Sequence, residues 1–264
     1  MIARRRSLYG LLALVLVSGR AQAQNKWSYD HMHLAAPDPQ QAMNWYVKNL
    51  GGKPSDDEGN VVPMEKASRV VFDGITFIFQ KSANVEPSSG SVIDDIGFSF
   101  ADVDAKGREL EAAGAKNAIP IREVPGLWKR GALVDPWGTK IELVEDPGLL
   151  GFHHIGLRVP DPEESLKWYV NAFGGERGKM KDRFDGVKYG RIWLTVLQGV
   201  GVVPSQGHTI DHLGFRPTNL DAAAAELKAK GVKFTMEPRV NASNGHHIAF
   251  AEGPGGVRIE LVQH

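Results

Sequence analysis

The sequence predicts an α+β protein built from four βαβββ modules. The modules are paired into two tandem domains, each a curled mixed β-sheet cup with helices outside. Two observations predict this fold. The chain contains a long internal repeat, and each repeated unit runs from an alternating strand into a capped helix and then into short strands. The composition agrees, because 42% hydrophobic and 23% charged residues are typical of a globular protein.

The repeat is clearest in two pairs of segments. DHMHLAAPDPQQAMNWYVKNLGG (30–52) aligns with HHIGLRVPDPEESLKWYVNAFGG (153–175), and IDDIGFSF (93–100) aligns with IDHLGFRP (210–217). Each half of the chain therefore contains two kinds of unit, which indicates a tandem duplication. Among polar residues the alignment pairs His31 with His154, Asp95 with His212, and Glu142 with Glu260.

The first unit shows how local patterns predict the elements. Residues 31–36 alternate as a strand does. Asp38 is a good helix N-cap, and Pro39 suits the first helical position. Gly51 and the glycine after it end the helix. Two strands are expected to follow, at 69–72 and 76–80.

The second unit has the same order of elements. A strand at 93–100 is followed by a helix at about 103–113, and short strands are expected at 119–122, at 132–134 and from Lys140. A linker near residue 148 separates this half from its copy. The sequence therefore predicts an N-terminal domain at 27–147 and a C-terminal domain at 151–264, each of ordinary size.

The first 23 residues have the pattern of a secretory signal peptide. Three arginines precede an apolar run from Leu8 to Val17, and Ala21 and Ala23 form a small-x-small cleavage pattern. RRSLYG also resembles a twin-arginine signal, so either the Sec or the twin-arginine route is open. The alternative is an uncleaved anchor, but the run is short for a bilayer core of about 30 Å. We expect an exported protein, periplasmic or secreted, with no membrane association after cleavage.

The charge and the cysteine count exclude several classes of function. Thirty-one basic residues balance 31 acidic ones, and this balance gives no support for nucleic-acid binding. The chain has no cysteine, which excludes disulfides, thiolate metal ligands and a cysteine nucleophile. The oligomeric state is not indicated by the sequence.

Strand alternation predicts a metal site in the second half. His154, His212 and Glu260 each lie on the face opposite the apolar residues of their own strand. If the strands curl into a cup, the three side chains can converge. Two imidazoles and one carboxylate form a facial triad that leaves metal positions open for water and substrate.

These motifs resemble those of the vicinal oxygen chelate superfamily, which includes glyoxalase I, extradiol dioxygenases and bleomycin-binding proteins. The resemblance is carried by HHIGLRVPDPEESLKWYVNAFGG, IDHLGFRP and GPGGVRIELV, in that order. It implies that His154, His212 and Glu260 hold one divalent metal ion, either Fe, Mn, Ni or Zn. It also implies that the metal chelates two neighbouring oxygens of a small-molecule substrate and acts as a Lewis acid.

The first half contains a weaker copy of this site. The equivalent residues are His31, Asp95 and Glu142. Aspartate in place of histidine still permits coordination through oxygen, but it makes the set less suited to softer metals. We expect a degenerate site in the N-terminal domain; the alternative for Glu142 is a carboxylate paired with a lysine.

Departures from the family pattern bear on the reaction. Glyoxalase I enzymes use a fourth ligand on a strand that corresponds to 191–198, where Leu194 or Thr195 stands. Extradiol dioxygenases have a tyrosine near the position of Phe250. His246 and His247 lie close by and are candidates for acid–base or outer-shell groups. The alternative is that both are exposed histidines at a loop edge.

Three classes of function remain open. The triad favours a metal-dependent enzyme acting on a small molecule with vicinal oxygens, as a dioxygenase, lyase or isomerase. The alternative is a non-catalytic protein of the bleomycin-resistance type that binds and sequesters a small molecule. A third class is a structural or interaction module of the cell envelope.

Overall fold

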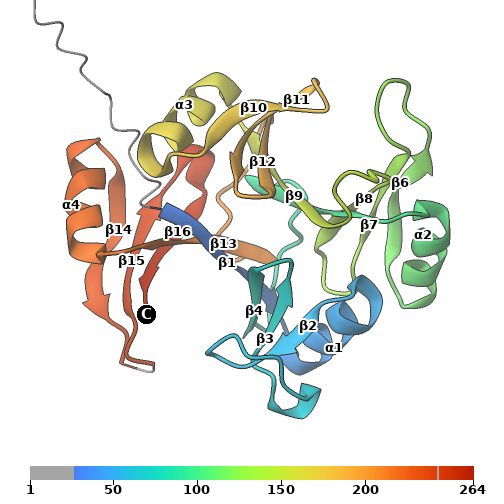
Figure 1. Ribbon diagram of the computed structural model, residues 1–264, viewed down its shortest axis with the longest axis horizontal. Coiled ribbons are helices and arrows are strands. Elements are labelled where there is room, and N and C mark those ends of the chain that lie inside the picture. Colours follow the sequence, from blue (N-terminus) through green and yellow to red (C-terminus); the bar gives the residue numbers. More distant parts are fainter. Residues whose placement is uncertain (1–26, 243) are drawn as a thin grey trace, which may run out of the picture.

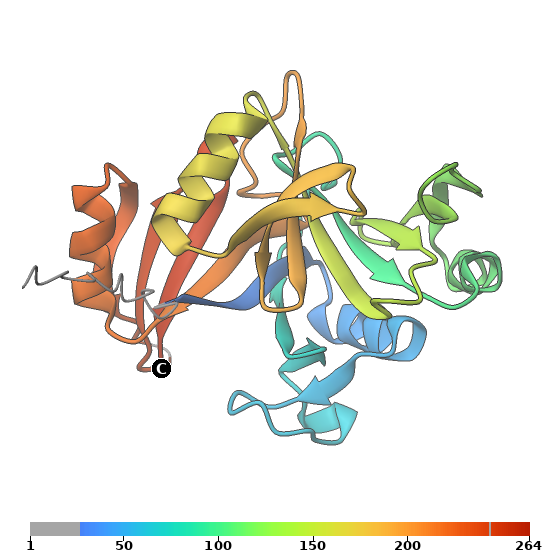
Figure 2. The same ribbon diagram turned by 45° about the horizontal axis from the view of Figure 1, so that its top comes forward.

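The computed structural model describes residues 27–242 and 244–264 (Figures 1 and 2). The expected signal peptide, residues 1–23, lies outside the described residues, so export stays a prediction. Within the described part of the chain, no helix is both long enough and apolar enough to cross a membrane.

The first half folds as two modules of the expected kind. Module 1 contains β1 (Trp27–Ala36), α1 (Pro39–Leu50), β2 (Lys53–Ser55), η1 (Met64–Lys66), β3 (Arg69–Phe72) and β4 (Ile75–Lys81). Module 2 contains β5 (Ile93–Ser99), α2 (Val103–Ala112), β6 (Lys116–Arg122), β7 (Arg130–Val134) and β8 (Lys140–Val144). The expected strands and helices are present, and β1 begins four residues earlier than the alternation at 31–36 indicated.

The second half repeats both modules. Module 3 contains β9 (Gly151–Val159), α3 (Pro162–Phe173), β10 (Glu176–Met180), β11 (Phe184–Tyr189) and β12 (Ile192–Gln198). Module 4 contains β13 (Ile210–Pro217), α4 (Leu220–Ala229), β14 (Lys233–Val240), β15 (His247–Glu252), η2 (Pro254–Gly256) and β16 (Arg258–Gln263). The aspartates that cap α1 and α3 occupy equivalent places, and each accepts a bond from the backbone N–H three residues on.

Hydrogen bonds join the strands into two mixed eight-stranded sheets. The first sheet has the order β14-β15-β16-β13-β1-β4-β3-β2, and the second has the order β10-β11-β12-β9-β5-β8-β7-β6. Helices α1 and α4 pack on the first sheet, and α2 and α3 pack on the second (Figure 1). We call the face opposite the helices the open face. The α+β class, the four modules and the two mixed sheets are confirmed.

The pairing of the modules differs from the simplest interpretation of the repeat. Module 1 shares a sheet with module 4, and module 2 shares a sheet with module 3. The joints are two antiparallel pairs, β1 with β13 and β5 with β9. Local alternation cannot distinguish this pairing from one within each half, because all four first strands have the same pattern of buried and open faces.

Aromatic side chains join the two sheets in one core. Phe77 of β4 packs edge-on against Phe152 of β9, with ring centroids 5.2 Å apart. Phe173 of α3 stacks on Phe215 of β13 at 4.2 Å. The buried hydroxyl of Tyr46 on α1 donates to a carboxylate of module 2, Asp135, at 2.8 Å. The two sheets are therefore packed against each other, not connected only by the chain that runs between them.

This exchange of modules predicts how the chain responds to being cut. We expect that residues 27–147 and 148–264, produced separately, do not fold as monomers, because each half lacks the strands that pair with its β1 and β5 or its β9 and β13. When the two halves are produced together, they should associate into one complex with the mass of the whole chain. Light scattering after size-exclusion chromatography measures this, and a stable folded monomer of either half would contradict it.

Candidate metal centre

Four side chains converge on the open face of the first sheet. His31 and His33 come from β1, His212 from β13 and Glu260 from β16. The Nε2 atoms of His31 and His212 each lie 3.0 Å from the same oxygen of Glu260, Oε2. The Nε2 atom of His33 lies 3.7 Å from that oxygen. All four offer one ligand atom within a small volume, as a metal centre requires.

The strand register explains this convergence. His33 stands opposite His212 in the antiparallel pair of β1 with β13, and His31 stands opposite Gly214. Gly214 in turn is the parallel partner of Glu260. A Cβ atom at Gly214 would lie 2.2 Å from Cε1 of His31, so the imidazole ring lies directly over this glycine. The absence of a side chain at Gly214 is what lets His31 reach Glu260.

Two aspartates orient the histidines. Nδ1 of His31 lies 2.8 Å from Asp30, and Nδ1 of His212 lies 2.6 Å from Asp211. Arg258 also donates to Asp211 at 2.6 Å. A carboxylate that accepts the Nδ1 proton leaves the Nε2 lone pair free, and this is the usual arrangement of metal-binding histidines. Both Nε2 atoms are directed towards Glu260, so the arrangement fits a divalent metal ion.

The charges in this cluster are strongly coupled. Burial would raise the pKa of Glu260, but hydrogen bonds from His212 and His31 outweigh it and hold that pKa well below its usual range. Burial lowers the pKa of His31, yet its hydrogen bonds to Asp30 and Glu260 raise it overall. Glu260 is therefore ionised in a buried position, where a carboxylate needs compensating positive charge.

A second cluster lies at the equivalent place on the second sheet. Nε2 of His154, on β9, is 3.0 Å from Oε2 of Glu142 on β8 and 3.5 Å from Oδ1 of Asp95 on β5. The ring of His154 lies over Gly97, as that of His31 lies over Gly214. The two clusters thus share one backbone design, and they differ in the side chains around it.

The second cluster carries its own cations. The guanidinium of Arg130 is paired with Glu142, and the ammonium of Lys140 lies 2.6 Å from Asp94 and 3.6 Å from Asp95. In the first sheet, the strand position that corresponds to Arg130 is held by apolar Ile248. Sequence reasoning expected a lysine as the alternative partner of Glu142, and the observed partner is Arg130. These cations neutralise the carboxylates that a metal would need.

The orientation of His154 also differs. Its Nδ1 atom lies 2.9 Å from Nδ1 of His153, so a second imidazole stands where the first centre has an aspartate. Burial would raise the pKa of Glu142, but the hydrogen bond from His154 and the charges of His154 and Arg130 lower it to about 2. Burial would lower the pKa of His154, but Asp95 and Glu142 raise it to about 9. The second cluster therefore has the character of a buried ion-pair network.

The predicted ligand sets need correction. The set His154, His212 and Glu260 is not brought together, because His154 lies in the second sheet and the other two lie in the first. The weaker set has the same error, since His31 lies apart from Asp95 and Glu142. The physical reason is the pairing of β1 with β13 and of β5 with β9. This pairing places His31 of β1 with His212 and Glu260, and His154 of β9 with Asp95 and Glu142.

Two residues of the first centre were missed as part of it: Asp30 and Asp211. A signal for them was present in the sequence. Both anchored histidines follow an aspartate directly, and His154 follows a histidine instead. An Asp-His dipeptide in a strand does not ordinarily bring the two side chains to one face. Here the irregular register of β1 and β13 allows it.

The remaining candidates lie at the edge of the site or away from it. His247 lies 3.8 Å from Asp221 on α4, on the helix side of the sheet, so the geometry gives its predicted acid–base role no support. His246 contacts His264 at 3.4 Å, and through it approaches Asp30. Phe250 is the strand partner of Glu260 and packs against His212.

The place of the fourth glyoxalase I ligand is also corrected. The strand expected to carry this ligand, β12, borders β9 in the second sheet, where Thr195 stands beside Gly156. In the first sheet the equivalent strand is β4, which presents Thr76 beside His31 and Ile78 beside His33. Neither strand supplies a carboxylate at these places, so the expectation of a missing fourth ligand applies to both sheets.

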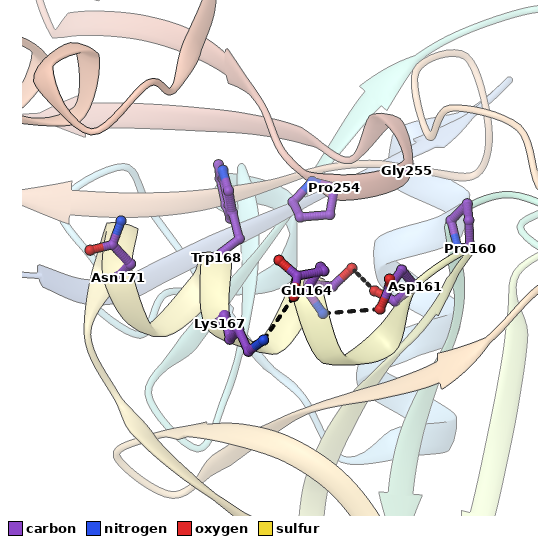
Figure 3. A pocket seen from close by; sticks show the side chains of 9 residues that line it. Pro160, Asp161, Glu164, Lys167, Trp168, Asn171, Pro254 and Gly255 are labelled. Carbon is purple, nitrogen blue, oxygen red and sulfur yellow. Dashed lines mark hydrogen bonds and ion pairs between the residues drawn. The ribbon is translucent and has the colours of Figure 1, made fainter.

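A surface groove of about 570 Å³ lies between α3 and η2 (Figure 3). In the first half, Trp137 packs against Trp45 at the equivalent junction, with ring centroids 6.0 Å apart. In the second half the aligned residue is Gly255, which brings no side chain. The charged groups of the groove are engaged within α3, as in the 2.8 Å bond from Lys167 to Glu164.

Comparison with known proteins identifies the family. The model of the Glyoxalase/Bleomycin resistance protein/Dioxygenase superfamily matches residues 28–143 and 151–261. The chain therefore belongs to this superfamily, as the resemblance of its motifs indicated. It is 28% identical over 154 residues to Glyoxalase I of Saccharomyces cerevisiae, a match covering 44% of this chain and 45% of the yeast protein. The chain thus aligns with less than half the length of that relative.

A shorter relative is matched over most of its length. A probable lactoylglutathione lyase of Vibrio cholerae is 30% identical over 122 residues, or 42% of this chain and 88% of that protein. Both relatives bear the names of enzymes. This similarity confirms the expectation of an enzyme whose reaction was left open.

Solved structures show the same fold. Glyoxalase I from Zea mays superposes with a TM-score of 0.67 at 18% identity, over 90% of this chain and 92% of the maize chain. A putative dioxygenase from Bacillus subtilis has a TM-score of 0.57 at 16% identity, over 89% and 84% of the two chains. At these identities the likeness concerns the fold alone.

The two equivalent glycines give a matched test of the first centre. In Gly214→Ala the new Cβ would lie 2.2 Å from the nearest atom of the His31 ring, and in Gly97→Ala it would lie 2.0 Å from the nearest atom of the His154 ring. Both variants should lose stability by about 1–3 kcal/mol through overpacking. Metal affinity should fall about tenfold or more in Gly214→Ala only. Thermal unfolding and metal titration measure the two effects; equal metal affinities would refute the assignment.

The second cluster predicts a pH dependence of stability. The pKa of His154 is about 9, above its ordinary value of 6.5. Its contribution to stability is therefore complete below pH 6.5 and is lost as the pH rises through 9. In metal-free protein, this loss should add a slope of up to about 1.4 kcal/mol per pH unit to the free energy of unfolding.

His154→Gln should remove that slope. Denaturant unfolding of the wild type and the variant between about pH 6 and 10 measures it, because all other titrating groups are common to both. An unchanged slope in His154→Gln would show that this histidine is not protonated in the folded protein.

Proposed function

We propose that the protein is a metal-dependent enzyme whose single metal centre is formed by His31, His212 and Glu260. The observation that carries the proposal is the orientation of the two histidines. Each has its Nδ1 held by an aspartate and its Nε2 directed at the same buried carboxylate oxygen. A divalent cation requires its ligand atoms to surround one common point, and the two Nε2 atoms and the Glu260 carboxylate lie close enough together to do so.

We propose a small-molecule substrate with two neighbouring oxygens. Three protein ligands leave positions where such a substrate can bind, and the metal ion would act there as a Lewis acid. The protein's own part is to hold the ligands and to keep the site on the open face of the first sheet. Among dioxygenase, lyase and isomerase chemistry, we favour a lyase, because the relatives of named function are glyoxalase I and probable lactoylglutathione lyases.

We propose further that the second cluster is a degenerate copy that holds no metal. Arg130 and Lys140 already supply positive charge to Glu142 and Asp95. The sequence pointed to a degenerate copy as well, but placed it within the N-terminal half. In this proposal the copy combines His154 with residues of the first half.

Metal content separates the two clusters. Protein purified without chelators should contain about one divalent metal ion per chain, Fe, Mn, Ni or Zn. His31→Ala and His212→Ala should lose both metal and activity, since each removes a ligand from the first centre. His154→Ala, the matched variant of the second cluster, should keep both. Elemental analysis of the wild type and the three variants measures the metal content.

Other outcomes would redirect the assignment. Loss of metal from His154→Ala with retention in His31→Ala would move the centre to the second sheet. No metal in the wild type, even after anaerobic reloading, would favour the alternative of a non-catalytic small-molecule binding protein.

A further inference from the structure

We propose that His33 is a fourth, displaceable ligand of the cation that the proposed function assigns to His31, His212 and Glu260. The inference rests on that proposed function. It adds that the resting centre is closed by a third imidazole, which leaves when a chelating substrate arrives.

The position of His33 suits coordination. Its Nε2 atom lies 3.7 Å from Oε2 of Glu260, and the four ligand atoms of the cluster all lie within 4.8 Å of one another. Metal–ligand bonds of about 2.0–2.2 Å put neighbouring ligand atoms about 3–3.5 Å apart. A small rotation of the His33 side chain would therefore bring its Nε2 atom into the coordination shell.

His33 differs from the other two histidines in how it is held. His31 and His212 have an aspartate on Nδ1, whereas Nδ1 of His33 is buried and has no hydrogen-bond partner among the described residues. The His33 ring is positioned by stacking on His212, with centroids 4.1 Å apart and planes 19° apart. Its side chain is 19% exposed, against 4% and 3% for the other two. The ring is thus the least anchored and lies nearest to solvent.

The unpaired Nδ1 atom makes displacement favourable. A buried polar atom without a partner has lost its hydrogen bonds to water and gained none in return, which destabilises this position of the ring. If the ring rotated towards water, Nδ1 would regain a hydrogen-bond partner. In the resting state, the bond from Nε2 to the metal would compensate for the unpaired Nδ1 atom. Because these two effects oppose each other, His33 can leave the metal when a substrate supplies two oxygens in its place.

The second cluster supports the assignment by contrast. The residue that aligns with His33 is Gly156, and a Cβ atom there would lie 2.2 Å from Oδ1 of Asp95. The space that His33 fills in one sheet is filled by the Asp95 carboxylate in the other. An imidazole at this place therefore occurs only in the sheet that has two aspartate-anchored histidines. Neighbouring Ile78 cannot compete with it as a ligand.

The test counts the imidazoles bound to the metal. We would strip the full chain, reload it with Ni²⁺ and record X-ray absorption spectra, in which coordinated imidazole rings give a distinct multiple-scattering signal. The variant is His33→Phe, which keeps an aromatic ring to stack on His212 and removes the ligand atom. The control is His154→Gln, which removes a histidine from the second cluster.

We expect three bound imidazoles in the wild type and the control, and two in His33→Phe. Adding oxalate, a chelator with two oxygens, should lower the count in the wild type from three to two. The dissociation constant for Ni²⁺ should rise about tenfold or more in His33→Phe. None of these results would follow from a purely structural role of the His33 ring.

Two imidazoles in both the wild type and His33→Phe would overturn the inference and leave the proposed function intact. Three imidazoles that persist with bound oxalate would overturn displacement, because His33 would then be a permanent ligand. A wild type that takes up no Ni²⁺ would overturn both the proposed function and this inference.

Discussion

The proposed metal centre depends on the antiparallel pairing of β1 with β13. This register places His33 beside His212 and His31 over Gly214, whose parallel neighbour is Glu260. A shift by one residue would turn both histidines of β1 into the core and bring apolar side chains to the open face. The pairing of β5 with β9 does the same for the second cluster, where Gly97 stands opposite His154. One backbone arrangement, used twice, thus accounts for the positions of both clusters.

The two clusters solve the same electrostatic problem in different ways. Each buries a carboxylate of the last strand of a module beside a histidine, and a buried charge needs a partner. In the second sheet that partner is part of the chain, because Arg130 pairs with Glu142. In the first sheet Ile248 holds the corresponding place, and two oriented imidazoles face Glu260 instead. The two clusters share one backbone arrangement and differ at a few surrounding positions. These differences are enough to give one cluster the character of a metal site and the other that of an ion-pair network.

Much of the fold could be predicted from the sequence, and less of the site. Local sequence patterns predict the strands, the helix caps and the duplication. Examples are the capping residues Asp38 before α1 and Asp161 before α3. The kinds of ligand and the faces they occupy also follow from alternation. Which strands pair does not, because β1 and β9 carry the same pattern and either could border β13. The predicted sets therefore contained His154 where the structure has His31, and the reverse. The neighbours of the ligands, Asp30 and Asp211, required the actual register of the strands.

The exchange of modules also ties the proposed metal binding to the folding of the whole chain. His31 comes from the first strand of the chain, and His212 and Glu260 come from the last module. Neither half contains the complete set, so the site forms only when β1 has joined β13. A cation that binds only this joined state stabilises it in proportion to its affinity. Because imidazole and carboxylate ligands from both halves would be linked through one ion, the free energy of metal binding becomes free energy of association between the halves. The second cluster makes the equivalent joint, between β5 and β9, through His154, which pairs with Glu142 and Asp95 of the first half. That joint needs no metal, so the chain can hold its two halves together before the first centre is loaded.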